Sequence, residues 1–251
     1  MTSFSLEGRT ALVTGARRGI GAAIAAGYAA AGAELILMAR DAALEDTLEA
    51  IKQNGGGNAT VVIADFTDPA AVAETAAKIV DNRKIDILVN NAGTIRRAPA
   101  AETTAADWQH VIDVNLNSTW AVTRPVGAAM VERRTGKIVT IASLLSFQGG
   151  VTVPAYTASK HAVAGLTRAL ANEWGPAGVQ VNAIAPGYIS TDNTAGLRAD
   201  PDREAAIRQR IPAGRWGRPE DLVGAAVFLA SAAADYVNGH VLAVDGGWLA
   251  R

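Results

Sequence analysis

The stretch TALVTGARRGIG at residues 10–21 decides the fold. A short apolar strand runs into a glycine-rich turn, and an alanine-rich helical stretch begins at Gly19. In such a turn Gly15 can supply the tight bend, Gly19 lets a phosphate approach the backbone, and Gly21 lets helix and strand pack closely. The helix N-terminus then offers free N–H groups to a pyrophosphate. A glycine turn can also be a plain strand–helix connection, so its position in the chain decides between the two interpretations.

Outward from this turn, short runs rich in valine and isoleucine alternate with segments long enough for helices. Seven strands alternating with helices predict an α/β fold, a doubly wound parallel sheet with helices on both faces, in a single domain covering residues 1–251. The predicted strands are residues 10–14, 34–38, 60–64, 85–89, 137–141, 180–184 and 240–244. The predicted helices are residues 19–31, 42–54, 69–80, 105–131, 156–174 and 219–229. The glycine turn therefore lies in the first strand–helix unit, which favours nucleotide binding.

The stretch at residues 187–217 breaks this alternation. It is polar and contains Arg198, Arg203, Arg208, Arg210 and Arg215, and it predicts no strand. In a doubly wound fold, an insertion beyond the carboxyl end of a strand lies where ligands bind. We therefore expect residues 187–217 to form a substrate lobe.

Composition excludes several classes of protein. The 251 residues carry a net charge of −1 and no cysteine. The balanced charge excludes the basic footprint of a non-specific nucleic-acid binder, and the missing cysteines exclude disulfide scaffolds, thiolate catalysis and cysteine-ligated metals. His110, His161 and His240 lie too far apart in sequence for ligand spacing, so no metal site is predicted. Residues 1–9 lack the pattern of a secretory signal and no stretch has the length of a membrane span, so we expect a cytoplasmic protein.

The end of the second predicted strand bears on the choice of cofactor. Dinucleotide sites that take an unphosphorylated ribose usually place a carboxylate here, about 20 residues beyond the glycines. This chain has Ala39 followed by Arg40, and Arg17 and Arg18 lie in the glycine turn. Alanine does not repel a 2′-phosphate, and arginines can bind it through paired charge-assisted hydrogen bonds. We therefore expect NADP(H) to be preferred over NAD(H), with no carboxylate opposing the phosphate, unless these arginines are only solvated surface charges.

Polar residues follow the later strands. NNAG at 90–93 comes directly after the fourth strand, Asn115 lies in the helical stretch beyond it, and Ser143 follows the fifth strand. Tyr156 and Lys160 stand four residues apart at the start of a helix, so their side chains share one face. A neighbouring ammonium favours the phenolate, so we expect Lys160 to lower the pKa of Tyr156 from its usual value of about 10. An isolated pair of this kind arises by chance on many helices, but the whole set at strand ends predicts a proton-transfer site.

These motifs together resemble the short-chain dehydrogenase/reductase family, and the resemblance covers the whole chain. They are TGARRGIG at 14–21, NNAG at 90–93, Asn115 within DVNL, Ser143, YTASK at 156–160, and Pro186-Gly187. The resemblance implies a Rossmann-type fold, with Tyr156 as proton donor, Lys160 on the nicotinamide ribose, Ser143 on the substrate oxygen and Asn115 in a proton relay. It also places Asp65 at the adenine, and Asn91 and Ile189 in the cofactor-binding wall.

The residues predicted to contact the cofactor come from the glycine turn, from the strand ends and from the resemblance. They are Gly15, Arg17, Arg18, Gly19, Ile20, Gly21, Arg40, Asp65, Asn91, Gly93, Tyr156, Lys160, Pro186, Gly187 and Ile189.

Within the family, four further stretches are similar to the 2-deoxy-D-gluconate 3-dehydrogenases, also called 2-dehydro-3-deoxy-D-gluconate 5-dehydrogenases. They are NAGTIRR at 91–97, LSFQGG at 145–150, RIPAGRWG at 210–217 and VDGGWLAR at 244–251. The resemblance implies an oxidoreductase that transfers a hydride between NAD(P)(H) and a hydroxy or keto sugar acid. Gluconate 5-dehydrogenases share part of this pattern, notably PAGRWG, and remain an alternative.

Two other activities are weighed against this one. A 3-oxoacyl reductase would share the catalytic residues, but its acyl-chain site should be apolar, whereas the predicted lobe is rich in arginine. A non-catalytic dinucleotide sensor would need only the glycine turn and not the set of Asn115, Ser143, Tyr156 and Lys160.

A sugar acid needs a cation for its carboxylate and polar partners for its hydroxyls. Arg96 follows the 90–93 turn and is our first choice for the carboxylate, because a bidentate arginine contact gives both affinity and orientation. Arg215 is the alternative. Gln148, in the loop between Ser143 and Tyr156, and Asn193, in the lobe, are candidate substrate contacts.

Assembly is also predicted. The resemblance implies a homotetramer in which the helices around 105–131 and 156–174 pack against their copies. The tail WLAR at 248–251 is apolar enough that we expect it to be buried at a subunit contact, unless it folds back on its own subunit.

Overall fold

The computed structural model describes residues 4–57 and 59–251 and contains a seven-stranded parallel sheet in the order β3-β2-β1-β4-β5-β6-β7. The strands are β1 (Thr10–Thr14), β2 (Glu34–Ala39), β3 (Thr60–Ile63), β4 (Ile87–Asn90), β5 (Gly136–Ile141), β6 (Val179–Pro186) and β7 (Val241–Val244). The predicted strands and the predicted sheet are therefore confirmed. Residues 1–3 of the stretch that was compared with a secretory signal lie outside the described residues.

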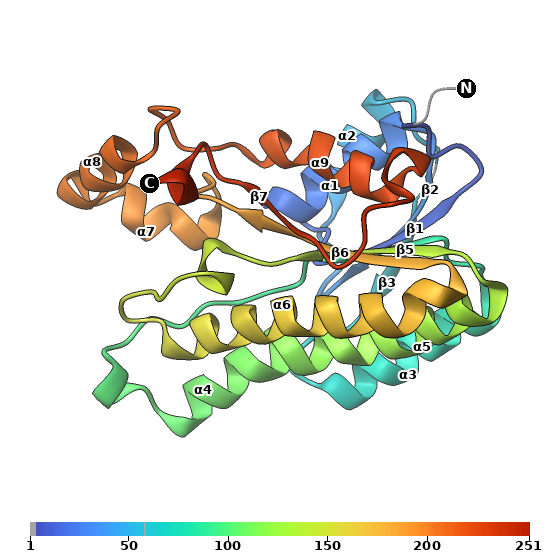
Figure 1. Ribbon diagram of the computed structural model, residues 1–251, viewed down its shortest axis with the longest axis horizontal. Helices are drawn as coiled ribbons and strands as arrows, with labels where there is room; N and C mark the ends of the chain where they lie inside the picture. Colours follow the sequence, from blue (N-terminus) through green and yellow to red (C-terminus); the bar gives the residue numbers. More distant parts are fainter. Residues whose placement is uncertain (1–3, 58) are drawn as a thin grey trace.

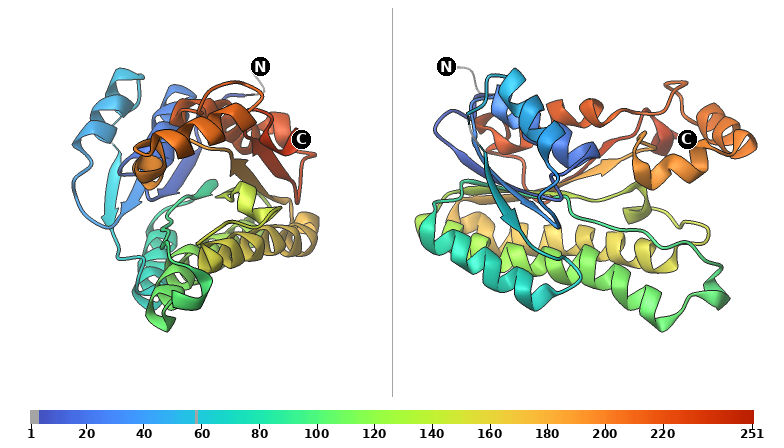
Figure 2. Two further views of the ribbon diagram at one scale, coloured as in Figure 1. Left: turned by 90° about the vertical axis from the view of Figure 1, so that its left-hand side faces the viewer. Right: turned by 180° about the vertical axis from the view of Figure 1, so that it is seen from behind.

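Helices cover both faces of the sheet, as Figures 1 and 2 show. One layer holds α1 (Gly19–Ala30), α2 (Glu45–Gln53) and α9 (Val223–Ala230), and the other holds α3 (Pro69–Asn82), α4 (Ala105–Ile112), α5 (Ser118–Arg133) and α6 (Pro154–Trp174). The first layer packs through a core that includes Ile24, Tyr28 and Leu229. The second packs through Val126 and Met130, among others. Each strand of the sheet interior is thus covered on both sides, which explains the near-continuous apolar runs of the sequence.

No helix within residues 4–57 and 59–251 combines the length and the apolar character that crossing a membrane would need.

The helix predicted at residues 105–131 is interrupted. A π-helical segment, Asp113–Asn117, separates α4 from α5. Single π turns insert an extra residue into a helix and are frequent at functional sites. Here the extra residue turns Asn115 inward, and its side chain is 1% exposed.

The polar stretch at 187–217 lies beyond the carboxyl end of the sheet (Figure 2) and forms two short helices, α7 (Ala195–Arg198) and α8 (Pro201–Arg210). Ile189 and Gly217 form an isolated parallel β-bridge that joins the beginning and the end of this stretch.

The chain's last residues pack on this stretch. The ring of Trp248 is 4% exposed, lies under the Arg210 guanidinium at 3.9 Å and contacts the Tyr188 ring at a centroid distance of 4.7 Å. The Arg251 guanidinium donates to the backbone oxygens of Gln209 and Arg210. The prediction that the tail is buried at a subunit contact is therefore wrong for Trp248, because its own subunit already covers the indole.

Candidate active site

A cavity of about 660 Å³ opens at the carboxyl ends of β1 and β4, where the strand order reverses. Ligands of doubly wound sheets bind at this switch point, since the two loops leave the sheet on opposite faces. Most of the predicted site residues lie in its wall. They are Gly15, Arg17, Arg18, Gly19, Ile20, Arg40, Asp65, Asn91, Gly93, Ser143, Tyr156, Lys160, Pro186, Gly187, Ile189 and Asn193.

The glycine turn is built as the sequence indicates. Gly15 has φ of +64°, and a Cβ on it would lie 2.8 Å from the Cα of Ala92. A Cβ on Gly21 would lie 2.4 Å from the Asn91 amide nitrogen and the Gly15 oxygen, so Gly21 lies behind the wall of the cavity and permits the close packing there. Any side chain at either position would displace the turn, which explains why both Gly15 and Gly21 are glycine.

Asn91 fastens this turn to the end of β4. Its side-chain amide donates to the backbone oxygens of Thr14 and Gly15, both at 3.0 Å. Its backbone N–H donates to the Thr14 hydroxyl at 2.9 Å. The two loops that border the switch point are therefore one hydrogen-bonded unit.

Ser143, Tyr156 and Lys160 meet on the opposite side of the cavity. Ser143 follows β5, and the other two side chains come from the first turns of α6. The Ser143 hydroxyl accepts from the Leu145 N–H at 3.1 Å and lies near enough to the Tyr156 phenol to act on its pKa. The Lys160 ammonium lies 5.6 Å from the centre of the Tyr156 ring and donates to the Ile141 oxygen at 2.7 Å. An oxygen of a ligand placed here can contact two hydroxyl groups at once.

The expectation that the pKa of Tyr156 lies below its usual value is wrong. Burial raises the pKa of Tyr156, and this outweighs the Ser143 hydrogen bond and the positive charge of Arg97, which act in the opposite direction. The phenol is therefore protonated at neutral pH. It is ready to donate a proton to a carbonyl oxygen.

Burial also lowers the pKa of Lys160, to about 8. The ammonium is present below that pH and is lost as the pH rises through it. If Lys160 holds the cofactor's ribose, the cofactor dissociation constant should increase several-fold between about pH 7 and about pH 9.5. Calorimetric titration across this range measures it. Lys160→Arg keeps its charge throughout, so its affinity should not change with pH, and a wild-type affinity that is constant above pH 8 would contradict the assignment.

Asn115 lies behind the cavity wall and joins two of its segments. Its amide nitrogen donates to the Thr94 oxygen at 3.0 Å and to the Ser159 hydroxyl at 3.1 Å. Its amide oxygen accepts from the Thr94 N–H at 2.8 Å. Asn115 thus ties the segment after β4 to the helix that carries Tyr156.

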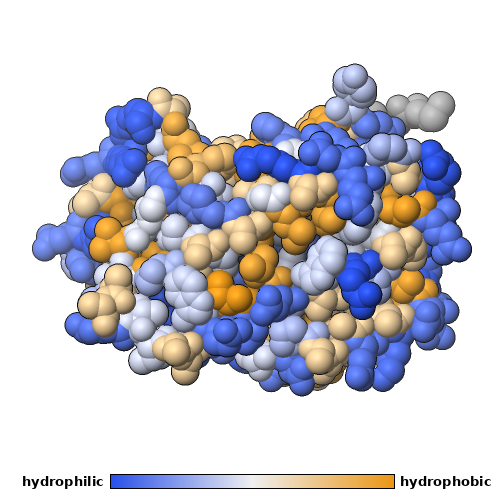
Figure 3. All heavy atoms as spheres, turned by 60° about the horizontal axis from the view of Figure 1, so that its bottom comes forward, coloured by the Kyte–Doolittle hydropathy of each residue, from blue (hydrophilic) through white to orange (hydrophobic). Residues whose placement is uncertain are grey.

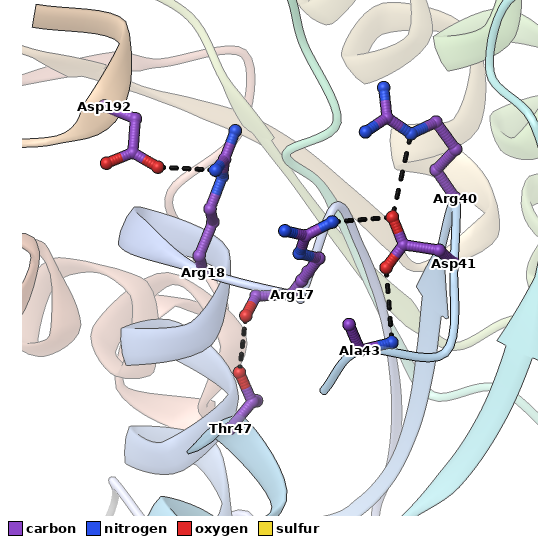
Figure 4. A network of polar contacts seen from close by, with 7 residues as sticks. All are labelled: Arg17, Arg18, Arg40, Asp41, Ala43, Thr47 and Asp192. Carbon is purple, nitrogen blue, oxygen red and sulfur yellow. Dashed lines mark hydrogen bonds and ion pairs between the residues drawn. The ribbon is translucent and has the colours of Figure 1, made fainter. Parts of the chain in front are cut away.

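The end of the cavity nearest β2 carries the predicted arginines, and Figure 4 shows them with their partners. Arg17 pairs with Asp41 at 2.6 Å, and the Arg40 Nε lies 3.8 Å from the same carboxylate oxygen. Arg18 pairs with Asp192 at 2.6 Å. The expectation that no carboxylate opposes a phosphate here is therefore wrong, because Asp41 and Asp192 line the cavity beside the arginines.

Two of the three predicted substrate residues do not line the cavity. The Arg96 Nε lies 3.8 Å from Asp107, and an Nη lies 3.5 Å from the His110 ring, so this guanidinium is directed toward α4. The Gln148 amide oxygen accepts from the Trp248 indole at 3.4 Å. Only Asn193 reaches the wall.

Arg97 was not assigned a role from the sequence, and it is not one of the residues that line the cavity. Its charge acts on the Tyr156 phenol, and its guanidinium donates to the Asn193 oxygen at 3.2 Å. His110 lines the cavity, although its spacing in the sequence gave it no role there. One sequence feature could have identified Arg97. It directly follows Arg96, and adjacent residues of an extended segment point in opposite directions, so the two arginines have different surroundings.

The cavity suits a dinucleotide on the grounds of its own residues. Gly15 and Gly19 carry no side chain where the turn meets α1. Arginines line the end where an adenosine phosphate would lie, and the hydroxyls of Ser143 and Tyr156 line the other end. A nucleotide held in this way would place a second ligand between Ser143 and Tyr156. The arrangement can therefore move a proton to or from an oxygen beside a bound cofactor.

Comparisons with known proteins agree with this geometry. A family model described as enoyl-(acyl carrier protein) reductase matches residues 15–249. A 2-dehydro-3-deoxy-D-gluconate 5-dehydrogenase from Bacillus subtilis is 56% identical over 249 residues, which cover 99% of this chain and 98% of that protein.

Two solved structures are similar along their whole length. A Beutenbergia cavernae protein proposed to be an NAD(P)-dependent gluconate 5-dehydrogenase, with NADP bound at low occupancy, is 57% identical with a TM-score of 0.97, covering 99% of this chain and 100% of that one. An Agrobacterium tumefaciens protein proposed to be a 2-deoxy-D-gluconate 3-dehydrogenase, with bound NADP, is also 57% identical, with a TM-score of 0.95 and full coverage of both chains. This chain belongs to the short-chain dehydrogenase/reductase family of oxidoreductases.

Proposed function

We propose that this protein is an NADP(H)-preferring dehydrogenase of a hydroxy or keto sugar acid of the 2-dehydro-3-deoxy-D-gluconate or 2-deoxy-D-gluconate type. The observation that carries the proposal is the meeting of Ser143, Tyr156 and Lys160 at one end of a cavity whose other end is lined by the glycine turn and arginines. The substrate class is supported by the Bacillus subtilis relative, which is 56% identical over 99% of this chain.

The proposed roles follow from the positions of the side chains. When bound, the nicotinamide supplies the hydride for carbonyl reduction or accepts it in alcohol oxidation. Ser143 and Tyr156 donate hydrogen bonds to the substrate oxygen, and the Tyr156 phenol delivers its proton to that oxygen. Lys160 holds the ribose. Asn115 keeps the Thr94 segment and α6 in register and supports the return of a proton to Tyr156.

Residues 187–217 act as a substrate lobe within a single catalytic domain, and Arg97 takes the role that the sequence gave to Arg96. The Arg97 guanidinium donates to the Asn193 backbone oxygen, and its positive charge acts to lower the pKa of the Tyr156 phenol, so we assign it the contact between the reacting end and the lobe. If the carboxylate of a sugar acid contacts Arg97, the rest of the substrate, with its hydroxyl groups, lies along Asn193 and the side of the cavity that holds Ser143.

An assay with a panel of sugar acids and both cofactors tests the proposed activity. We expect the highest kcat/KM with 2-dehydro-3-deoxygluconate or 2-deoxygluconate. Highest activity with gluconate and 5-ketogluconate would instead favour the gluconate 5-dehydrogenase alternative. Preference for uncharged ketones or acyl thioesters would overturn the sugar-acid assignment, and absence of turnover with every substrate would favour a dinucleotide sensor.

Cofactor preference is measured by calorimetric titration. We expect NADP(H) to bind more tightly than NAD(H), because Arg17, Arg18 and Arg40 surround the end of the cavity near β2. Arg40→Ala should weaken NADP(H) binding by about fivefold to tenfold and leave NAD(H) binding nearly unchanged, since in the proposed arrangement this exposed guanidinium contacts only the 2′-phosphate of the cofactor. Equal wild-type affinities for the two cofactors, or an Arg40→Ala variant that binds NADP(H) normally, would contradict this preference.

A cytoplasmic homotetramer remains part of the proposal, although the tail no longer supports it. Support comes from the layer of α4, α5 and α6, where Trp108 and Trp120 are 41% and 39% exposed. In Figure 3 the molecule is turned so that this layer comes toward the viewer. Apolar side chains lie among polar ones on the surface that is shown. Large aromatic side chains at a surface are typical of protein interfaces.

Light scattering measures the assembly directly. We expect a mass about four times the 25.8 kDa of one chain at micromolar concentration. Trp120→Glu should lower that mass, because a charge within a closely packed interface is costly, whereas Tyr236→Glu, at a fully exposed residue of another face, should not. A monomer mass for the wild type would exclude the tetramer.

A further inference from the structure

Two stretches singled out by their resemblance to sugar-acid dehydrogenases, residues 210–217 and 244–251, pack against each other around Trp248. The Trp248 indole is 4% exposed, and the Arg210 guanidinium lies over its ring at 3.9 Å. A cation over an aromatic face is attracted by the ring, and more strongly where water is excluded. The two stretches therefore form one unit, although neither supplies a group to the mechanism proposed above.

Trp248 lies where two segments of the site meet. On the side of the substrate lobe, its ring contacts the Tyr188 ring at a centroid distance of 4.7 Å. On the other side, its indole N–H donates to the Gln148 amide oxygen at 3.4 Å, and its ring shares a buried apolar cluster with Leu144, the residue after Ser143. One side chain therefore joins the lobe to the segment that carries the catalytic serine.

The backbone on either side of Trp248 is held by the carboxylate of Asp245. Its Oδ1 accepts from the Gly247 N–H at 2.8 Å, and its Oδ2 accepts from the Leu249 N–H at 2.9 Å. With both oxygens bonded to the chain that follows, the turn that presents the indole has a defined shape. Residues 245–251 are called the C-terminal strap below.

The C-terminal strap is held at both ends. At its beginning, the Gly187 N–H in the cavity wall donates to the Val244 oxygen at 3.0 Å. At its end, the Arg251 guanidinium donates to the oxygens of Gln209 and Arg210, the last two residues of α8, at 2.8 and 3.1 Å. Figure 1 shows the end of the chain beside α7 and α8. The strap therefore runs from the end of β6 to the far end of the lobe, with the indole between.

We propose that Trp248 is a positioning residue for the substrate: as the centre of the C-terminal strap, it keeps the substrate lobe at a fixed distance from the segment that carries Ser143. The inference rests on the proposed function, in which the lobe holds a sugar acid. The reacting oxygen of that acid must reach Ser143 and Tyr156, and a displacement of about 1 Å is costly in such a site. The cofactor is held by the glycine turn and Lys160, so its binding does not depend on the strap.

Trp216 provides a contrast within the lobe. Its ring meets the Tyr188 ring edge-on at 5.4 Å, and its indole N–H donates to the Glu204 carboxylate at 3.2 Å. Both partners belong to the lobe itself. A general loss of aromatic packing would act through both tryptophans, whereas the bridge to the Ser143 segment belongs to Trp248.

Steady-state kinetics of the full-length protein with 2-dehydro-3-deoxygluconate measure the effect on the substrate. Trp248→Ala should raise KM for the acid by about tenfold or more, with KM for the cofactor within about twofold of wild type. Trp248→Phe keeps a ring between Arg210 and Tyr188, so it should recover most of this loss. Trp216→Ala should raise KM for the acid less than Trp248→Ala does.

Limited proteolysis measures the position of the lobe without any substrate. Arg198 and Arg203 are exposed in the lobe, and trypsin cleaves after arginine. Cleavage there should be about threefold to tenfold faster in Trp248→Ala, because local opening becomes easier. Arg251→Ala, which removes two bonds of the strap, should give a smaller increase. Tyr236→Ala, at a fully exposed ring, is the control and should leave the cleavage rate and both KM values unchanged.

Three outcomes would overturn the proposal. They are an unchanged KM for the acid in Trp248→Ala, equal increases of KM in Trp248→Ala and Trp216→Ala, and an unchanged cleavage rate in Trp248→Ala. A thermal melt shows whether each variant is folded. If Trp248→Ala does not fold, Arg251→Ala takes its place, and an unchanged cleavage rate in that variant would exclude the role of the strap. Since proteolysis needs no substrate, it can succeed while the panel assay fails, and it can fail while the sugar-acid activity stands.

Discussion

Replacing Tyr156 with phenylalanine should lower kcat by about 10²–10⁴-fold while leaving the cofactor affinity within about twofold of wild type. The phenyl ring keeps the packing beside Lys160, and only the hydroxyl is lost. Because burial keeps the phenol protonated, it is the group best placed to give its proton to a carbonyl oxygen. Steady-state rates measure kcat, and titration of the variant measures the cofactor affinity.

Tyr236→Phe is the matched control for this change. Tyr236 is fully exposed, so the loss of its hydroxyl should leave both quantities as they are in the wild type. Turnover of Tyr156→Phe at the wild-type rate would show that another group donates the proton. Loss of cofactor binding in the same variant would instead mean that the hydroxyl holds the cofactor and does not act on the substrate.

Arg97→Ala should raise KM for the sugar acid by about tenfold to a hundredfold, with little change in KM for the cofactor. A hydrogen bond between charged groups contributes about 1.5–3 kcal/mol, and Lys160, the other cation near Tyr156, is assigned to the cofactor ribose in the proposed arrangement. The measurement is a pair of saturation curves, one with the acid varied and one with the cofactor varied. An uncharged analogue of the acid, such as its methyl ester, should lose much less in the variant than the acid does.

Arg96→Ala is the comparison that makes this result decisive. Arg96 adjoins Arg97 and carries the same charge, but its guanidinium is directed toward Asp107 and His110. Its removal should change KM for the acid by less than about twofold. If Arg96→Ala has the larger effect of the two, the carboxylate is held by Arg96, as the sequence alone suggested.

The fold was predictable because its strands are short apolar runs separated by helices of ordinary length. Seven runs of this kind leave one common solution, a parallel sheet with covered faces, and the glycine turn marks its first unit. The interruption of the 105–131 helix was not predictable from periodicity. A π turn changes the helical phase by one residue without changing the local composition, so Asn115 lies in a run that still has the pattern of a helix.

The meeting of Ser143, Tyr156 and Lys160 at one end of the cavity was predictable from the sequence, but the electrostatics of that end were not. The order of strand ends places Ser143 near Tyr156, and helical spacing places Lys160 beside it. The pKa of Tyr156 depends on how deeply the fold buries the phenol, and sequence spacing contains no such information. The same limit explains Asp41. A carboxylate one residue beyond Arg40 is visible in the sequence, but only the bend after β2 shows that it turns back toward Arg17.

The bonds from Asn91 to the glycine turn have a consequence for the order of folding events. They join Asn91 to Thr14, 77 positions away, so the nucleotide cleft is a non-local structure although its glycines are consecutive. Contacts that close such long loops form late, after helices such as α1 have had time to appear. During refolding, recovery of nucleotide binding should therefore follow the pairing of β1 with β4 and lag behind the recovery of helical signal. A chain emerging from a ribosome acquires the cleft only after the residues that follow β4 have left the exit tunnel.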